Sequence, residues 1–100
     1  SIEKKANLTT SINKRVLFAS TLVYPNPAIS VLNVNATLKE VAGQTKVTIR
    51  DYMGRMVSSA QIHAGKQIVY QHDVSALHSG WYVIEFNSIN GSWRQSFLKF

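Results

Sequence analysis

The stretch Asp51-Tyr52-Met53-Gly54-Arg55 separates two runs in which apolar and polar side chains alternate, Thr45 to Arg50 and Met56 to Ile62. Alternation of this kind is typical of β-strands with one buried face. A type I turn that closes into a G1 bulge needs a residue with positive φ just before the second strand, and Gly54 takes that conformation without a Cβ penalty. The sequence therefore predicts a β-hairpin whose acidic residue bonds the turn's own amides and whose arginine can reach back toward it.

Short strand patterns recur along the rest of the chain, with turn signals about every eight to twelve residues. Pro25-Asn26-Pro27 ends the first of them, because each proline fixes φ and removes an amide donor, and it predicts a rigid extended corner over Tyr24 to Ala28. Residues 37–44 are expected to form a loop, and Asn90-Gly91 is the strongest hairpin signal. The expected strands are Val16 to Tyr24, Ile29 to Ala36, Thr45 to Arg50, Met56 to Ile62, Gln67 to Val74, Trp81 to Phe86 and Trp93 to Lys99.

These strands, with no segment long and periodic enough for a helix, predict an all-β fold: a seven-stranded antiparallel immunoglobulin-like β-sandwich without a cysteine pair. Thr48 is expected to face outward. The inward face of Met56 to Ile62 is ambiguous, because a bulge there would shift the register. The expected core consists of Leu32, Val34, Val47, Ile49, Tyr82, Ile84 and Phe86.

Composition divides the 100 residues into a flexible linker over residues 1–15 and one domain over residues 16–100. The formal net charge is +6, but half of this surplus lies in the linker, and the other Lys and Arg residues are scattered singly along the strands. Without a basic patch interleaved with aromatic residues, nucleic-acid binding is disfavoured. No apolar run approaches the roughly 20 residues that cross a bilayer as a helix, so no direct membrane insertion is expected, and the opening residues lack the apolar segment of a signal peptide.

Catalytic chemistry would have to be built from His63, His72 and His78 with Asp51 and Asp73. His72 and Asp73 are adjacent on a strand and therefore point to opposite faces, so they do not form an orienting pair. Each histidine is expected to be exposed or half-buried, and no metal-ligand spacing of known type occurs. The sequence also lacks a Gly-x-Ser-x-Gly elbow and any cysteine. It predicts no catalytic, cofactor or metal site.

A carbohydrate-binding or adhesion module is the alternative function, because Tyr52, Tyr70, Trp81 and Trp93 would supply the stacking platform that such modules use. In a domain of this size, aromatic residues at alternating strand positions are more often core residues or cross-strand pairs. If Tyr82 faces inward, however, Trp81 faces outward.

The turn and strand signals together form an ordered set of motifs. They are Val23-Tyr24-Pro25-Asn26-Pro27, Leu32-x-Val34, Val47-x-Ile49-x-Asp51-x-x-Gly54-Arg55-x-Val57, Asp73-Val74-Ser75-x-Leu77-x-x-Gly80-x-Tyr82 and Trp93-x-x-x-Phe97-x-Lys99. This order resembles the type A C-terminal sorting domain of the type IX (Por) secretion system of the Bacteroidetes, over about Leu22 to Phe100. Two departures are Phe100 after the usual terminal Lys, and Trp81 where an aliphatic residue is commoner.

The resemblance implies a non-catalytic secretion signal at the end of a larger cargo protein. In the family, an ordinary signal peptide far upstream takes the precursor across the inner membrane, and outer-membrane machinery recognises the folded domain in the periplasm. A cell-surface sortase then cuts in front of the domain, and many cargoes are joined to anionic lipopolysaccharide. The implied partners are this machinery, its sortase and a preceding cargo domain, and an open sheet edge would also allow self-association.

The resemblance also picks out the sorting-motif residues Pro25, Asn26, Pro27, Asp51, Gly54, Arg55, Leu77, Gly80, Tyr82, Phe97 and Lys99. Backbone geometry alone explains the prolines and glycines among them. Arg55 and Lys99 have no compulsory backbone role, so they are the better candidates for contact with a receptor, and Lys99→Glu is expected to remove no core contact. The strand that ends at Lys99 is expected to be a sheet edge on which the machinery depends most.

Overall fold

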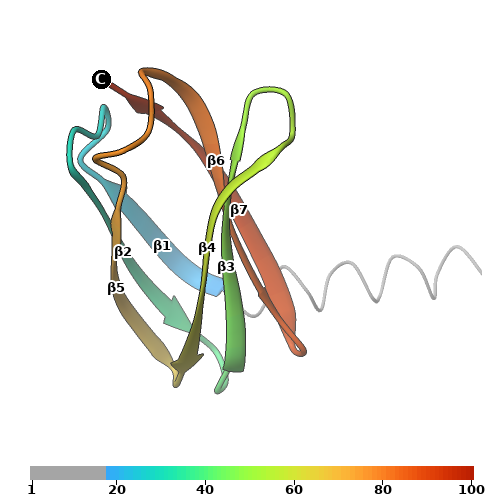
Figure 1. Ribbon diagram of the computed structural model, residues 1–100. Coiled ribbons are helices and arrows are strands. Elements are labelled where there is room, and N and C mark those ends of the chain that lie inside the picture. The colour runs from blue at the N-terminus through green and yellow to red at the C-terminus, as the bar shows by residue number, and fades with distance from the viewer. Residues whose placement is uncertain (1–17) are drawn as a thin grey trace, which may run out of the picture.

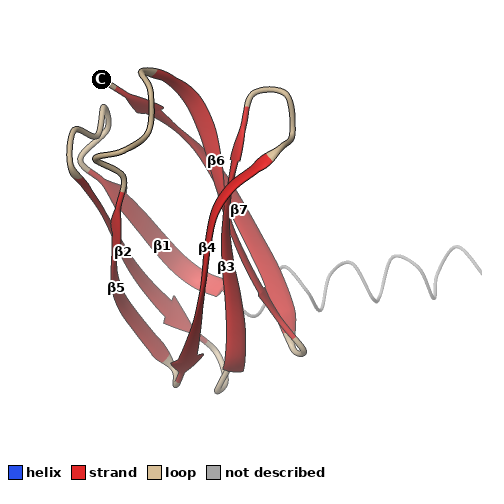
Figure 2. Cartoon of the chain, in the orientation of Figure 1, coloured by secondary structure: helices blue, strands red, loops and turns tan. Residues whose placement is uncertain are grey.

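The computed structural model describes residues 18–100, which form seven strands in two packed sheets and no helix (Figures 1 and 2). The strands are β1 Phe18–Tyr24, β2 Val31–Leu38, β3 Gly43–Asp51, β4 Met56–Ala64, β5 Gln67–Asp73, β6 Gly80–Ser88 and β7 Gly91–Lys99. One sheet has the order β1-β2-β5 and the other β4-β3-β6-β7, and all these pairs are antiparallel. The predicted seven-stranded sandwich is confirmed. The linker predicted over residues 1–15 lies outside the described residues.

The core lies between the sheets, where alternate residues of each strand point inward. Leu32 and Val34 from β2 meet Val47, Ile49, Ile84 and Phe86 from the opposite sheet, and all of them are at most 1% exposed. Every predicted core residue is buried, as expected from strict period-two alternation. Burying a side chain of this size contributes roughly 1.5–3 kcal/mol, so this layer is the main source of stability.

One expectation about the strands is wrong, and a second is correct in direction but not in exposure. Half of the expected loop at residues 37–44 is strand, because Leu38 is buried and Gly43 already pairs with Ala64, so the loop is confined to residues 39–42. Thr48 faces away from the core but is only 2% exposed. It lies on a central strand directly between Ser59 and Glu85 of the flanking strands, and their side chains shield it from water.

A bulge in the β3–β4 ladder determines which side chains of β4 point inward. Ile49 pairs with Ser58 whereas Arg50 pairs with Met56, so Val57 is an extra residue in the ladder. As a result Ser58 and the alternate residues after it turn inward, and Met56 and Val57 stay exposed. A bulge at this position is the register shift that the sequence had left open.

The turns at the two ends of the sandwich differ from expectation in detail. The chain does not continue extended after Tyr24; it reverses direction through two cis X-Pro bonds, Tyr24-Pro25 and Asn26-Pro27, and returns as β2 beside β1. The β6–β7 hairpin exists, but its connecting residues are Ile89 and Asn90, neither with positive φ, while Gly91 already pairs with Ser88. The Asn-Gly pair is therefore shifted by one residue from the place that the sequence predicted.

Because consecutive strands run antiparallel, alternate connections fall at the same end of the sandwich. The β1–β2, β3–β4 and β5–β6 connections and the last residues of β7 gather at one end, and β1 begins at the other (Figure 1). We call the first of these the loop end, formed by residues 24–30, 51–57, 74–82 and 97–100. Residues 18–100 contain no helix long and apolar enough to span a membrane.

Candidate functional site

All of the predicted sorting-motif residues lie at the loop end, although the sequence scatters them from Pro25 to Lys99. The antiparallel order brings them together, since each motif segment is a connection at this end or the adjoining end of a strand. They differ in exposure: Asp51, Tyr82, Phe97 and Lys99 are buried, and Pro25, Asn26, Gly54 and Arg55 are exposed.

The Asp51–Arg55 turn has the geometry that its sequence predicts. The Gly54 amide donates to the Asp51 carbonyl at 2.9 Å, and Gly54 has a φ of 86°, the left-handed value a G1 bulge needs. Oδ1 of Asp51 accepts the amides of Met53 at 2.9 Å and Arg55 at 3.0 Å, and Oδ2 accepts Nε of Arg55 at 2.9 Å. Partial burial opposes ionisation of Asp51, but these bonds outweigh it and lower the pKa of the carboxyl. The turn is thus held by one charged carboxylate.

The β1–β2 connection is bound to the outer edge of β7, and this joins the two sheets at the loop end. The Leu98 amide donates to Oδ1 of Asn26 at 3.0 Å, and the Ala28 amide donates to the Leu98 carbonyl at 2.7 Å. The Phe100 amide then donates to the Ala28 carbonyl at 2.9 Å. β7 is an edge strand, as expected, but its last residues are already paired with this connection.

The β5–β6 connection is fixed by aromatic contacts. The Tyr82 hydroxyl donates to the His78 carbonyl at 2.7 Å, and its ring stacks on Phe97 with centroids 5.8 Å apart. Gly80 has a φ of 151°, which residues with a side chain rarely adopt. Leu77 packs against the core. These motif residues therefore fix the conformation of the β5–β6 connection through contacts with the core and with its own backbone.

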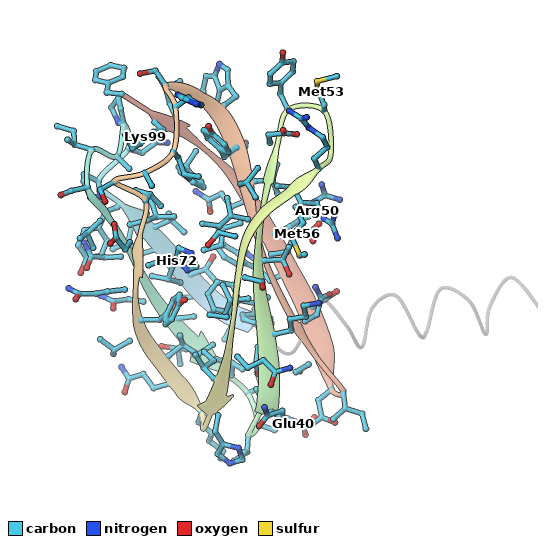
Figure 3. All side chains as sticks on the ribbon, in the orientation of Figure 1. Glu40, Arg50, Met53, Met56, His72 and Lys99 are labelled. Atoms are coloured by element: carbon cyan, nitrogen blue, oxygen red, sulfur yellow. The ribbon has the colours of Figure 1, made fainter. Side chains whose placement is uncertain are left out.

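Lys99 does not have the position expected of a contact residue. It follows Phe97 at the alternate position on the inner face of β7, is only 6% exposed, and its Nζ donates to the Phe100 backbone oxygen at 2.8 Å (Figure 3). The expectation that Lys99→Glu removes no core contact is therefore wrong, because the substitution would place a carboxylate in a buried site.

One histidine is buried, contrary to expectation. His72 is 7% exposed and points from β5 toward β4 in the interior of the sandwich (Figure 3). Its Nε2 lies 2.7 Å from the Ser58 hydroxyl and its Nδ1 lies 2.6 Å from the Tyr70 hydroxyl. Burial lowers the pKa of His72 despite the attraction of Asp73, and burial raises the pKa of Tyr70. A neutral ring both donates and accepts, so the contact is a satisfied link between the sheets.

No sequence pattern predicted this link, because Ser58 and His72 come from strands of different sheets. Asp73 faces the other side of β5, as the adjacency argument predicted, and its Oδ1 accepts the Ser75 amide and hydroxyl. His63 and His78 are exposed. Within residues 18–100, no group of three or more His, Asp or Glu side chains is placed to hold a metal ion.

A groove of about 360 Å³ runs between the Asp51–Arg55 turn and the β5–β6 connection. Its exposed apolar walls are Tyr52 (81% exposed), Val57 (41%) and Trp81 (57%). Arg55 lies at its edge, and its floor includes the motif residues Asp51, Leu77, Gly80 and Tyr82. A larger cavity of about 540 Å³, lined by Phe18, Glu85, Asn87, Ser92, Trp93 and Arg94, includes none of the sorting-motif residues.

The aromatic residues do not form a shared stacking platform. Tyr70 meets Phe86 edge-on at 5.9 Å, and Trp93 packs against Phe86 at 5.8 Å and stacks on Phe18 at 6.0 Å. Only Tyr52 and Trp81 of the proposed platform are exposed. The carbohydrate-binding alternative therefore loses half of the residues on which it rested.

Comparison with known proteins gives a family and a fold. Residues 22–99 match the family model described as "Secretion system C-terminal sorting domain". The solved structure titled "Biofilm associated protein - BSP domain" superposes with a TM-score of 0.62 and 17% sequence identity, over 83% of this chain and 15% of that chain. At this identity the likeness concerns the fold alone. No curated protein matches the chain.

Proposed function

The chain belongs to the family of secretion system C-terminal sorting domains, and from this we propose that it is a type A signal of the Bacteroidetes type IX system, directing an attached cargo protein across the outer membrane. Membership of the family supports a sorting role without catalysis, and export to the cell surface or the medium. The outer-membrane machinery recognises the folded domain during periplasmic transit. A cell-surface sortase then cleaves in front of the domain, and the cargo is anchored to anionic lipopolysaccharide.

The observation that carries the proposal is the convergence of the motif residues on the loop end. Segments separated by as many as 72 residues are hydrogen-bonded there, as Asn26 and Leu98 are. A receptor that recognises these motif residues must contact several segments of the folded domain at once, because no single segment contains all of them. A free peptide of β7 alone would carry Phe97 and Lys99 without the neighbours that position them.

Burial divides the motif residues by role. Tyr82, Phe97 and Lys99 act in recognition through the shape that they maintain, because their side chains are less than a tenth exposed. Arg55, whose side chain is 73% exposed, remains the motif residue best placed for direct contact. Pro25 and Asn26 are exposed but set the course of the β1–β2 connection.

The test is a secreted reporter enzyme, preceded by its own signal peptide and fused in front of this chain, in a host with a type IX system. We expect reporter activity on the cell surface or in the medium. Deletion of residues 96–100 should leave the reporter in the periplasm, because it removes both the core residue Phe97 and the Leu98 bonds to the β1–β2 connection. Full export of the truncated fusion, or periplasmic retention of the intact fusion, would contradict the proposal.

A further inference from the structure

We propose that the groove between the Asp51–Arg55 turn and the β5–β6 connection is the contact surface for a protein of the secretion machinery with apolar side chains and an acidic rim. The inference rests on the proposed function and adds to it the residues and the chemistry of the contact. Of its apolar contact residues, Tyr52 and Trp81 lie between motif positions, and Val57 is the last position of the motif that begins at Val47.

The first observation is the exposure of these side chains. Tyr52 is 81% exposed, Trp81 57% and Val57 41%, and all three line the same groove. Single exposed apolar residues are ordinary on protein surfaces, but a contiguous apolar surface in a concave site marks an interaction site. Tyrosine and tryptophan are also the residue types most enriched at the energetic centres of protein interfaces.

The second observation is the sign of the charge around the groove. Arg55 lines the groove and bonds Asp51. Arg50 does not line it, but it donates to the Gly54 carbonyl of the adjoining turn at 3.1 Å and bonds Glu85. The exposure within each ion pair is unequal. The arginine side chains are 73% and 40% exposed, whereas the carboxylates are 9% and 17% exposed. A partner protein at this surface therefore contacts guanidinium groups that are held in place, while the carboxylates that hold them are mostly buried. Complementary charge steers association, so the partner's rim should be acidic.

The third observation is that the buried motif residues support this surface. The Asp51 carboxylate fixes the turn that presents Tyr52, and Gly80 and Tyr82 flank Trp81 on β6. β1, the first strand of the described residues, begins at the opposite end of the sandwich (Figure 1). A cargo domain is thus attached away from the groove.

The experiment compares matched double variants of the reporter fusion. Tyr52→Ser with Trp81→Ser removes the aromatic walls, and Val41→Ser with Ile89→Ser removes apolar residues that are 52% and 93% exposed at the opposite end. We expect the groove variant to lower exported reporter at least about tenfold, the effect of losing a central aromatic contact, and the control to export normally. Circular dichroism melting of the purified chain checks that both variants fold.

Charge is tested in the same way. Arg50→Gln with Arg55→Gln removes two positive charges at the turn beside the groove, and Lys39→Gln with Lys66→Gln removes two at the opposite end of the sandwich. Only the first pair should slow export, by at least about threefold, since a rim charge acts mainly on the association rate. Equal effects of the two pairs would contradict an acidic partner rim.

A third experiment identifies the partner that binds the groove. Photo-crosslinking from p-benzoylphenylalanine at Tyr52, but not at Ile89, should yield an adduct with an outer-membrane protein of the machinery. Adducts only with a second copy of the chain, or with lipopolysaccharide, would overturn the proposal, as would normal export by the groove variant. If the unsubstituted fusion were not exported, the proposed function itself would fail; if it were exported and the groove variant too, only this inference would.

Discussion

The Ser58 hydroxyl on β4 lies 2.7 Å from Nε2 of His72 on β5, and this contact bridges the two sheets. β4 follows the Asp51–Arg55 turn directly, and β5 leads into the connection on the other side of the groove. The bond therefore links the strands that hold the two walls. It is a polar interaction inside a core that is otherwise mostly apolar.

Ser58→Ala should lower the free energy of unfolding by about 1–3 kcal/mol, because it leaves one ring nitrogen of buried His72 without a partner. Urea denaturation of the purified chain measures the change. Ser59→Ala, at the exposed neighbouring position, is the control and should be nearly neutral. Equal effects of the two substitutions would mean that the link adds nothing to stability.

Stability should fall with acid in a range set by His72. The folded protein lowers the pKa of this residue below its ordinary value of 6.5, so the unfolded chain binds the proton more readily. Its contribution is therefore complete above pH 6.5 and is lost progressively as the pH falls below that value. The Asp51 and Asp73 carboxyls, whose pKa values are lowered from 3.8, titrate below this range. Denaturation of His72→Gln from pH 8 to about 5 should show a flatter profile than the parent.

Gly54→Val should destabilise the domain by about 1–3 kcal/mol, because a β-branched residue is forced to a positive φ. Gly54 has a φ of 86° and open space around the Cβ position, so the cost is one of conformation and not of collision. Gly65→Ala, also in open space but without a positive φ, should be neutral or slightly stabilising. Thermal melting of both variants provides the comparison, and a parent-like Gly54→Val would disprove the strain.

Lys99→Glu should destabilise by on the order of 2–4 kcal/mol, since it buries a carboxylate beside the Phe100 backbone oxygen that the ammonium now contacts. Lys99→Met keeps the length and apolar stem of the side chain and should cost about 1 kcal/mol. Comparing export by the two fusions separates structure from recognition. If Lys99→Met melts like the parent and still fails to export, the ammonium itself is recognised.

The sandwich and its core could be predicted because period-two alternation survives in nearly every strand. Leu32, Val47 and Ile84 are buried for the reason that the pattern gave. The same alternation, continued from Phe97, would have placed Lys99 on the inner face, but its charge argued for exposure. The Asn90-Gly91 signal was misplaced because pairing of Phe86 with Trp93 fixes the register.

The groove and the His72 link could not be predicted, because they depend on which strands face one another. Ser58 turns inward only because Val57 is an extra residue in the ladder. Tyr52 and Trp81 share a groove only because two connections fall at the same end of the sandwich. The motif spacing identified the residues that support the groove, but it did not predict how close the Asp51–Arg55 turn lies to the β5–β6 connection.

The hydrogen bond between Asn26 and Leu98 forms only when the chain has been synthesised almost to residue 100. This bond spans 72 residues, so the β1–β2 connection acquires its partner only after almost the whole domain has left the ribosome. A product of interrupted translation can contain the Asp51–Arg55 turn and yet lack the strand that completes this end. Export that depends on the finished loop end would therefore select full-length cargo and leave truncated chains behind for degradation.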